Sequence, residues 1–240
     1  MTVSIEEQSN QRKVALTAGI SLIIMALAAF FSSGFAHANL VVKGDASATY
    51  HNIMAAPLLF NAEIFGWFII LITDIVVAWA FYIFLKPIHK NFSLLAAWLR
   101  LIYATVLGIA ILNLLFVLLL TKNTTYLSFF KIDQLQAHIM LFLEAFESIW
   151  SIGLIIFGGH LMIVGYLTVK SASIPKVISI LLLLASVGYI VIHFCNTFSP
   201  ENDKFISILQ ILFSIPMIAG ELGFGIWLLL KGGKTSQNGR

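Results

Sequence analysis

The residues of this sequence best suited to chemistry are ionisable side chains that interrupt long apolar segments. They are Glu63, Asp74, Arg100, Glu144, Glu147, His160, His193 and Glu221. A charge in the hydrocarbon core of a membrane is costly, so such residues face a bundle interior or a cavity and mark ion, proton or ligand sites. Each of them is therefore a candidate functional residue.

Four of these side chains fall at one depth, and we call them the midplane layer: Asp74, Arg100, His160 and Glu221. Each lies nine to twelve residues from the polar residue that ends its apolar segment. At the helical rise of 1.5 Å per residue this is roughly 14–18 Å, close to the middle of a bilayer core about 30 Å thick. The sequence therefore predicts one polar layer to which four helices contribute.

Arg100 determines the chemistry of the midplane layer, because a guanidinium keeps its proton and needs an anionic partner inside a membrane. Asp74 is the expected partner, since only the short turn "KPIHKN" separates the two segments. Glu221 would extend the pair to a triad with one excess negative charge, which a protonated His160 or a proton on Glu221 would neutralise. Two interpretations stay open: a ligand or proton site, or an ion pair that only fixes helix packing.

The other candidates form a second layer nearer the opposite end of the segments, which we call the outer layer: Glu63, Glu144, Glu147 and His193. Carboxylates and imidazole on facing helices are a metal-binding combination. However, the pairs Glu-x-x-His and His-x-x-x-His do not occur in the sequence, and we assign no metal site.

Helical spacing connects the two layers. Glu63 and Asp74 are eleven residues apart, which is three turns, and Gln210 and Glu221 repeat that spacing. A further segment carries polar residues three and four apart, which share one face of a helix: Ser186, Tyr189, His193 and Asn196. These patterns predict inward polar faces that run from the outer layer to the midplane layer.

Sequence motifs of known enzymes do not occur here. The chain lacks a Walker A motif, GxSxG and HExxH, and Ser148 or Ser151 near Glu147 is too weak a basis for a catalytic serine. We therefore assign no catalytic residue and identify no cofactor, and the missing motifs favour a protein that is not an enzyme. The one cysteine, Cys195, excludes an intrachain disulfide and a CxxC motif.

The composition assigns the chain to the membrane. Hydrophobic residues make up 60%, charged residues only 10%, and the mean hydropathy is +0.97. Soluble domains carry about 25% charged residues. In lipid, backbone groups must be satisfied by helices or closed barrels, and the apolar runs do not alternate as barrel strands do. The partner is thus the lipid bilayer, and the basic residues are topology signals rather than a nucleic-acid surface.

The predicted fold is an all-α, polytopic transmembrane bundle that forms one domain over residues 1–240. Its six spans cover about 14–35, 59–85, 92–120, 136–169, 177–197 and 205–230. The fourth is too long for one crossing, so we expect it to tilt or project. With both termini in the cytoplasm, nine Lys and Arg residues lie inside and four outside, which the positive-inside rule favours. A bacterial inner-membrane location follows.

The first span has features of a signal peptide, a basic start and "AHA" at 36–38. Its apolar core is longer than the 7–15 residues typical of such peptides, so we predict a retained helix. The long connection at 36–58, which holds His37, Asp45 and His51, is expected to be a solvated loop, with a partly helical flap as the alternative. The glycine runs "FGGH" and "GELGFG" predict that the two helices that carry them pack closely against each other. Pro216 predicts a kink in the last helix beside Glu221.

The sequence resembles the uncharacterised bacterial membrane-protein family catalogued as domain of unknown function 4386. The resemblance lies in "GDASATYHNIMA", "DIVVAWAFYIFLKPIHKNFSLLAAWLRLIYA", "GGHLMIVGYLTVKSASIPKVISILL" and "GELGFGIWLLLKG". These stretches hold the whole midplane layer and none of the outer layer. The resemblance implies a single six-helix domain and carries no activity with it.

Together these patterns favour a protein that binds or transports a small solute or ion at the midplane layer, with proton coupling. In this hypothesis Asp74 and Glu221 carry negative charge or a proton, Arg100 anchors them, and His160 shuttles the proton. The alternative is a non-transporting scaffold or regulator whose ion pairs only specify helix packing. The sequence assigns no oligomeric state.

Overall fold

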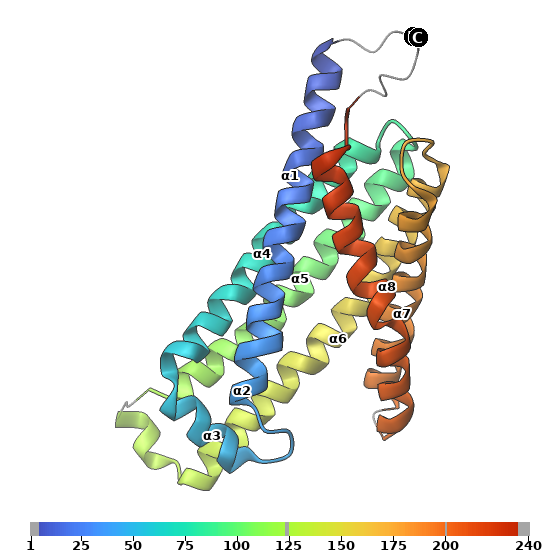
Figure 1. Ribbon diagram of the computed structural model, residues 1–240. Coiled ribbons are helices and arrows are strands. Elements are labelled where there is room, and N and C mark those ends of the chain that lie inside the picture. Colours follow the sequence, from blue (N-terminus) through green and yellow to red (C-terminus); the bar gives the residue numbers. More distant parts are fainter. Residues whose placement is uncertain (1–4, 123–124, 200, 235–240) are drawn as a thin grey trace.

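The computed structural model describes residues 5–122, 125–199 and 201–234, and every regular element in these ranges is helical. The elements are α1 (Ile5–Ala29), the π-helix η1 (Phe30–His37), α2 (Ala38–Leu40), α3 (Ala46–Ala55), α4 (Pro57–Leu85), α5 (Lys90–Leu120), the 3₁₀ helix η2 (Thr125–Phe129), α6 (Ile132–Lys170), α7 (Lys176–Phe198) and α8 (Asp203–Leu230). Figure 1 shows them as one elongated bundle. The predicted all-α class is confirmed.

Six helices are long and apolar enough to cross a membrane, which confirms the six-span prediction. They cover Glu6–Leu40, Pro57–Leu85, Lys90–Leu120, Ile132–Lys170, Lys176–Phe198 and Asp203–Leu230. After six crossings the start of α1 and the end of α8 lie at the same end of the bundle (Figure 1). We call this the terminal end and the opposite one the open end. The cytoplasmic placement of the terminal end and the single-domain assignment stay predictions.

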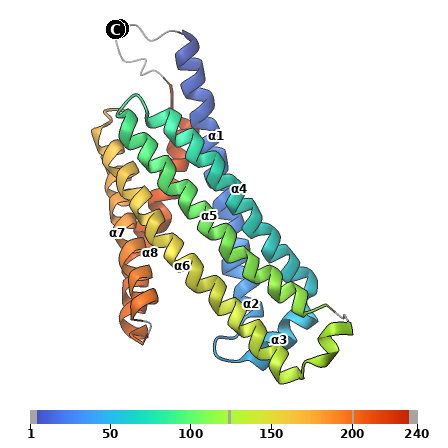
Figure 2. The same cartoon turned by 180° about the vertical axis from the view of Figure 1, so that it is seen from behind.

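The six long helices pack as a closed ring in chain order. Each contacts the next one, and α8 returns to contact α1. Figure 2 shows α4, α5 and α6 side by side on the rear of this ring. Ionisable side chains that are fully buried lie on its inward faces: Glu63, Asp74, Arg100 and His160. The ring therefore holds charged groups that lipid would not tolerate.

At the terminal end the ring is closed by close backbone approach and by a side-chain cap. A Cβ atom at Gly19 of α1 would lie only 2.9 Å from the carbonyl oxygen of Gly225 of α8. Arg12 donates hydrogen bonds to the carbonyl oxygens of Leu228, Leu229 and Gly232 at 3.0, 2.6 and 2.8 Å. It thereby caps the carbonyl end of α8, where the last carbonyls of a helix have few helical partners.

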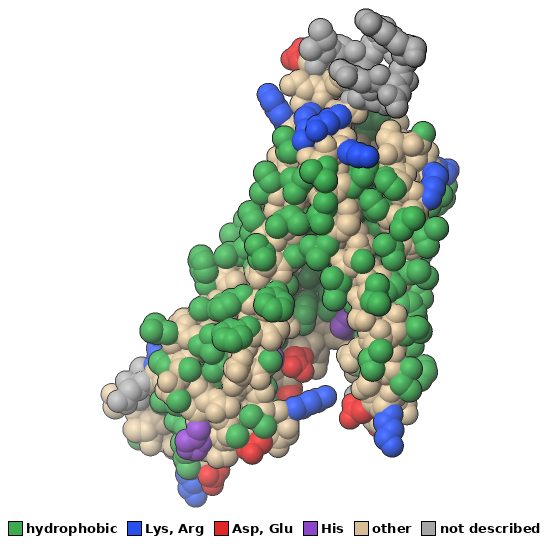
Figure 3. All heavy atoms as spheres, in the orientation of Figure 1, with side chains coloured by type: hydrophobic (Ala, Val, Ile, Leu, Met, Phe, Trp, Pro, Cys, Tyr) green, Lys and Arg blue, Asp and Glu red, His purple; other side chains and the backbone are tan. Residues whose placement is uncertain are grey.

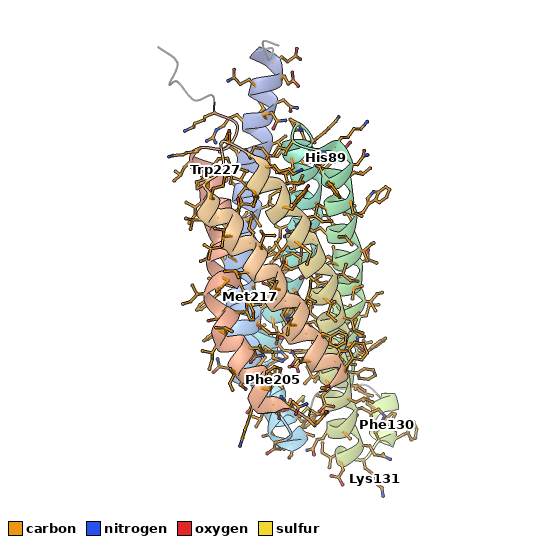
Figure 4. The ribbon with its side chains drawn as sticks, turned by 90° about the vertical axis from the view of Figure 1, so that its right-hand side faces the viewer. His89, Phe130, Lys131, Phe205, Met217 and Trp227 are labelled. Carbon is orange, nitrogen blue, oxygen red and sulfur yellow. The ribbon has the colours of Figure 1, made fainter. Side chains whose placement is uncertain are left out.

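Toward the open end α8 separates from α1 but stays packed against α7, where a Cβ at Gly188 would lie 2.7 Å from Phe213. Figure 4 shows the course of this helix, with Trp227 near the terminal end, Met217 half-way along and Phe205 toward the open end. Over that distance large apolar side chains become 62–76% exposed: Ile208, Ile211, Leu212, Ile215 and Ile218. Figure 3 shows a cleft here, between α7 and α8 on one side and α2, α3 and α6 on the other. Acidic, basic and histidine side chains lie along its walls (Figure 3).

Two expectations about the helices need correction. The connection at 36–58 takes the alternative form of a partly helical flap rather than a solvated loop, because the first span continues through η1 and α2, and α3 packs against α6. The two glycine runs do not pack against each other. A Cβ at Gly158 of α6 would meet Ser186 and Ile190 of α7, and one at Gly220 of α8 would meet Leu181 of α7. Thus α7 lies between the helices of His160 and Glu221.

Candidate functional site

Arg100 is the centre of the midplane layer. Its Nε and Nη2 atoms donate hydrogen bonds to Oδ1 of Asp74 at 2.9 and 2.7 Å, and both side chains are fully buried. The short turn between α4 and α5 brings the two helices together, as the sequence predicted. Oδ2 of Asp74 has no hydrogen-bond partner among the described residues.

His160 completes the other side of Arg100. Its Nδ1 lies 2.8 Å from the carbonyl oxygen of Ala96, and its Nε2 lies 3.1 Å from Nη1 of Arg100. A carbonyl only accepts and a guanidinium only donates, so Nδ1 carries the ring proton and Nε2 is the acceptor. The geometry thus makes His160 a neutral imidazole. A second proton on Nε2 would point at the guanidinium, so His160 is poorly placed to offset the charge of Glu221.

Aromatic and thioether groups surround the Arg100–His160 contact. The guanidinium carbon lies 5.8 and 5.1 Å from the ring centroids of Phe81 and Phe157, and Nη2 lies 3.4 Å from Sδ of Met25 on α1. The His160 ring stacks between the same two phenyl rings. Ring quadrupoles of this kind stabilise a cation away from water. Sequence reasoning missed these residues, since apolar side chains give no signal in an apolar segment.

Glu221 joins the layer without contacting Arg100. The hydroxyl of Tyr189 on α7 donates to its Oε1 at 3.1 Å, and the carboxylate lies within electrostatic range of Arg100 and Asp74. Both Glu221 and Tyr189 are half-buried, unlike the sealed ion pair. The midplane residues therefore converge on the ring axis, with Glu221 as the more accessible member.

In the outer layer, Glu63 and Glu147 meet through a residue that was not among the candidates. Nδ1 of His37 lies 2.7 Å from Oε1 of Glu63, and its Nε2 lies 3.2 Å from Oε1 of Glu147. His37 ends η1, so the continuation of the first span as a π-helix is what places it there. We call these three residues the His37 triad. A histidine just beyond the predicted end of span 14–35 was its only sequence signal.

The remaining outer-layer residues lie apart from the triad. Glu144 is exposed and makes no hydrogen bond or ion pair with a described residue. His193 of α7 instead lies with its Nδ1 2.8 Å from Oγ of Ser151 on α6. Ser151 sits in mid-helix, where backbone N–H groups are engaged in helical bonds, so this pair has no oxyanion hole beside it. We therefore assign it no nucleophilic role.

The His37 triad is not arranged as a metal site. Its two carboxylates contact opposite nitrogens of one imidazole ring, so they do not converge on a common point. Among the described residues, no group of three or more His, Cys, Asp and Glu side chains is placed to hold a metal ion. The arrangement instead suits a hydrogen-bonded link between α4, the end of the first span and α6.

Aromatic side chains line the axis between the two layers. Trp67 of α4 packs edge-on against Phe146 and Trp150 of α6, with centroid distances of 5.0 and 4.7 Å. Nε1 of Trp150 donates to the hydroxyl of Tyr103 on α5 at 3.4 Å. The two polar layers are thus joined across the ring by indole and phenol groups, which combine apolar bulk with a hydrogen-bonding atom.

Comparison with known proteins places this chain in a family. An uncharacterized protein of Archaeoglobus fulgidus is 32% identical over 193 residues, which is 78% of this chain and 96% of the relative. No solved structure matches. Residues 17–232 match the family described as a domain of unknown function (DUF4386), and this range contains the midplane layer and the His37 triad. The chain belongs to the DUF4386 family, as the resemblance of its charged membrane segments indicated.

Proposed function

We propose that this multi-pass membrane protein binds a small cationic solute or ion at the midplane layer and moves it through the membrane. The observation that carries the proposal is that Glu221 is a half-buried carboxylate with no cationic partner in contact among the described residues. Ionisable groups at this depth mark ion and substrate pathways. A proton or a bound cation at Glu221 would supply the missing positive charge.

The charges of the layer support this assignment. Asp74 and Arg100 neutralise each other, and the hydrogen bonds of His160 make it a neutral ring. Glu221 is then the excess negative charge of the layer, and the Tyr189 hydroxyl donates to only one of its oxygens. A small cation would bind at the Glu221 carboxylate, beside the ring of Tyr189.

Proton coupling follows from the same charge balance. The excess carboxylate, Glu221, binds either a proton or a cation, but not both at once. Binding of the solute therefore releases the proton. The cleft on the α8 side gives the solute access from the open end (Figure 3). Closure of this cleft, with opening of the terminal end, would complete transport.

Binding is tested with purified protein in nanodiscs against a panel of monovalent ions and small organic amines at two pH values. At least one cation is expected to raise the Tm of the wild type and to leave that of Glu221→Gln unchanged. Glu144→Gln, which removes an exposed carboxylate, is the matched control and retains the response. The proposal fails if no cation raises the Tm and proteoliposomes show no pH-dependent flux.

A structural role is the second candidate, and the completeness of the Arg100 contacts favours it. Asp74, His160, Met25 and two phenyl rings surround the guanidinium, as in an ion pair that fixes helix register. The exchange Asp74→Arg with Arg100→Asp separates the two functions. Full biological activity of the exchanged protein would support a scaffold, whereas recovery of folding without activity would support a binding site.

We further propose that the terminal end faces the cytoplasm of a bacterial cell and that the protein resides in the inner membrane. The excess of Lys and Arg in the connections at this end supports the orientation. Reporter enzymes fused after residue 234 and into the connection at 123–124 test it. Activity of a cytoplasmic reporter at the latter position would reverse the assignment.

A further inference from the structure

One face of α4 carries three buried polar atoms that have no hydrogen-bond partner. They are Oε2 of Glu63, Nε1 of Trp67 and Oδ2 of Asp74, on side chains that are 0–1% exposed. Spacings of four and seven residues place all three on the inward face of the helix. Native structures rarely leave such atoms unsatisfied, so each requires a partner beyond the described side chains.

The unsatisfied atoms complement one another chemically. Glu63 and Asp74 offer acceptors at the two ends of the row, and the Trp67 indole offers a donor between them. On α5, the Tyr103 hydroxyl accepts a hydrogen bond from Trp150 and has its own proton left to donate. Tyr103 lies within electrostatic range of Asp74. The hydrogen-bond donors of Trp67 and Tyr103 thus lie between the acceptors of Glu63 and Asp74. Eleven residues separate these two carboxylates on α4, which is about 16 Å along the helix axis.

Water satisfies this pattern better than a direct contact would. A buried water molecule makes two to four hydrogen bonds to otherwise unsatisfied polar groups. A shift of one side chain could form a hydrogen bond between Glu63 and Trp67, but Oδ2 of Asp74 would still have no donor. A file of water would supply a donor to both carboxylates and an acceptor to the Trp67 N–H.

We infer that ordered water molecules join Glu63 to Asp74 along the inward face of α4, and that this file links the His37 triad to the midplane layer. It begins at Glu147, which is 54% exposed at the open end, and it passes through His37 and Glu63. It ends at the ion pair between α4 and α5.

The file gives protons a route from the open end to the midplane layer along the inward face of α4. Carboxylate, imidazole, water and phenol each pass a proton by accepting one hydrogen and donating another, so no other bond is broken. This role rests on the proposed function, whereas the water itself does not. Failure of cation binding would therefore leave the file intact, and failure of the file would leave the cation site intact.

The experiment measures water contact at the indole N–H of Trp67 in 15N-tryptophan-labelled protein in nanodiscs, with signals assigned by Trp→Phe variants. Trp150 is the internal control, because its ring lies 4.7 Å away and its Nε1 is already bonded to Tyr103. We expect a cross-peak between water and the Trp67 indole, and exchange into D₂O at least tenfold faster than for Trp150. Local unfolding would expose both rings and equalise the two rates.

Variants then test whether Glu63 holds the water. Glu63→Leu is expected to abolish the cross-peak and to slow Trp67 exchange about tenfold. Glu63→Gln keeps an acceptor oxygen and retains both signals, which keeps the test decisive if the leucine variant does not fold. Glu144→Leu changes neither. The inference is overturned if Trp67 of the wild type shows no water contact and exchanges as slowly as Trp150.

Discussion

The two ends of the helix ring differ in how they are closed. At the terminal end, α1 and α8 touch through glycines and Arg12 caps α8, while Phe81, Phe84, Phe224 and Trp227 fill the axis with contacting rings. At the open end, a cleft with ionisable walls separates α7 and α8 from α2, α3 and α6 (Figure 3). The midplane layer is the boundary between the two.

This difference indicates which half of the molecule moves at low cost and which half must break packed contacts before it opens in the proposed transport cycle. Close backbone contacts and interlocked rings resist displacement, because dense packing has few alternative arrangements. The open half of α8 loses little when it moves, since its side chains exchange lipid contacts for protein contacts of similar apolarity. Closure of the cleft is therefore expected to pivot α8 near Gly220 and Pro216.

The largest expected effect is at the boundary itself. Arg100→Ala leaves Asp74 buried without its counter-charge, so the free energy of unfolding should fall by about 3–5 kcal/mol, measured by denaturant titration in detergent. The double variant Asp74→Leu with Arg100→Met removes both charges and should recover most of that loss. An equal loss of unfolding free energy in the single and the double variant would mean that side-chain volume, rather than charge pairing, stabilises the midplane layer.

Next comes the contact that closes the terminal end. Gly19→Leu would drive a side chain into the Gly225 backbone, and we expect a loss of about 3 kcal/mol in unfolding free energy. Gly223→Leu is the matched control, because a Cβ at Gly223 has no atom within 4 Å. Its stability should be unchanged or slightly raised, since glycine is unfavourable inside a helix. Equal losses at both positions would refute close packing as the cause.

A smaller effect is expected at the open end, in the His37 triad. His37→Ala removes the one hydrogen-bond partner that the described side chains give to the buried Glu63 carboxylate, which should cost about 1–2 kcal/mol. Glu147→Gln alters a side chain that is 54% exposed and should cost less than about 0.5 kcal/mol. Thermal unfolding of the two variants compares them directly. A larger loss of stability for Glu147→Gln than for His37→Ala would mean that the contact with α6, rather than the contact with α4, holds the end of the first span.

The smallest effect is expected on the free half of α8. Ile211 is 76% exposed, so Ile211→Ala should change the unfolding free energy by less than about 0.5 kcal/mol. Leu228, in the terminal half of the same helix, is fully buried, and its replacement by alanine should cost about 2–4 kcal/mol. Similar losses at the two positions would show that α8 packs evenly along its length, contrary to the comparison.

The midplane layer was predictable because it depends on regular geometry. A fixed rise per residue and a known polar end place Asp74, Arg100, His160 and Glu221 at one depth without any knowledge of contacts. The short turn between α4 and α5 was sufficient to pair Asp74 with Arg100. The number and class of the helices followed from hydropathy, since a bilayer allows few backbone solutions.

The details that depend on side-chain direction were not predictable. Glu221 approaches the layer through Tyr189, because α7 stands between α8 and α6. His37 was assigned to a loop, since hydropathy falls before the helix ends and the π-helical segment adds a polar turn. Met25 and Phe157 have no local signal that distinguishes an axial side chain from one that faces lipid.

The closed ring in chain order also has a consequence for biogenesis. The first and last spans of the chain are neighbours, and Arg12 bonds to carbonyls 216, 217 and 220 residues away. During synthesis, the face of α1 that packs against α8 therefore stays without its protein neighbour until α8 has left the ribosome and entered the membrane. The bundle is then complete only when the whole chain has been inserted, so a prematurely terminated product exposes its unpaired first helix to membrane quality control.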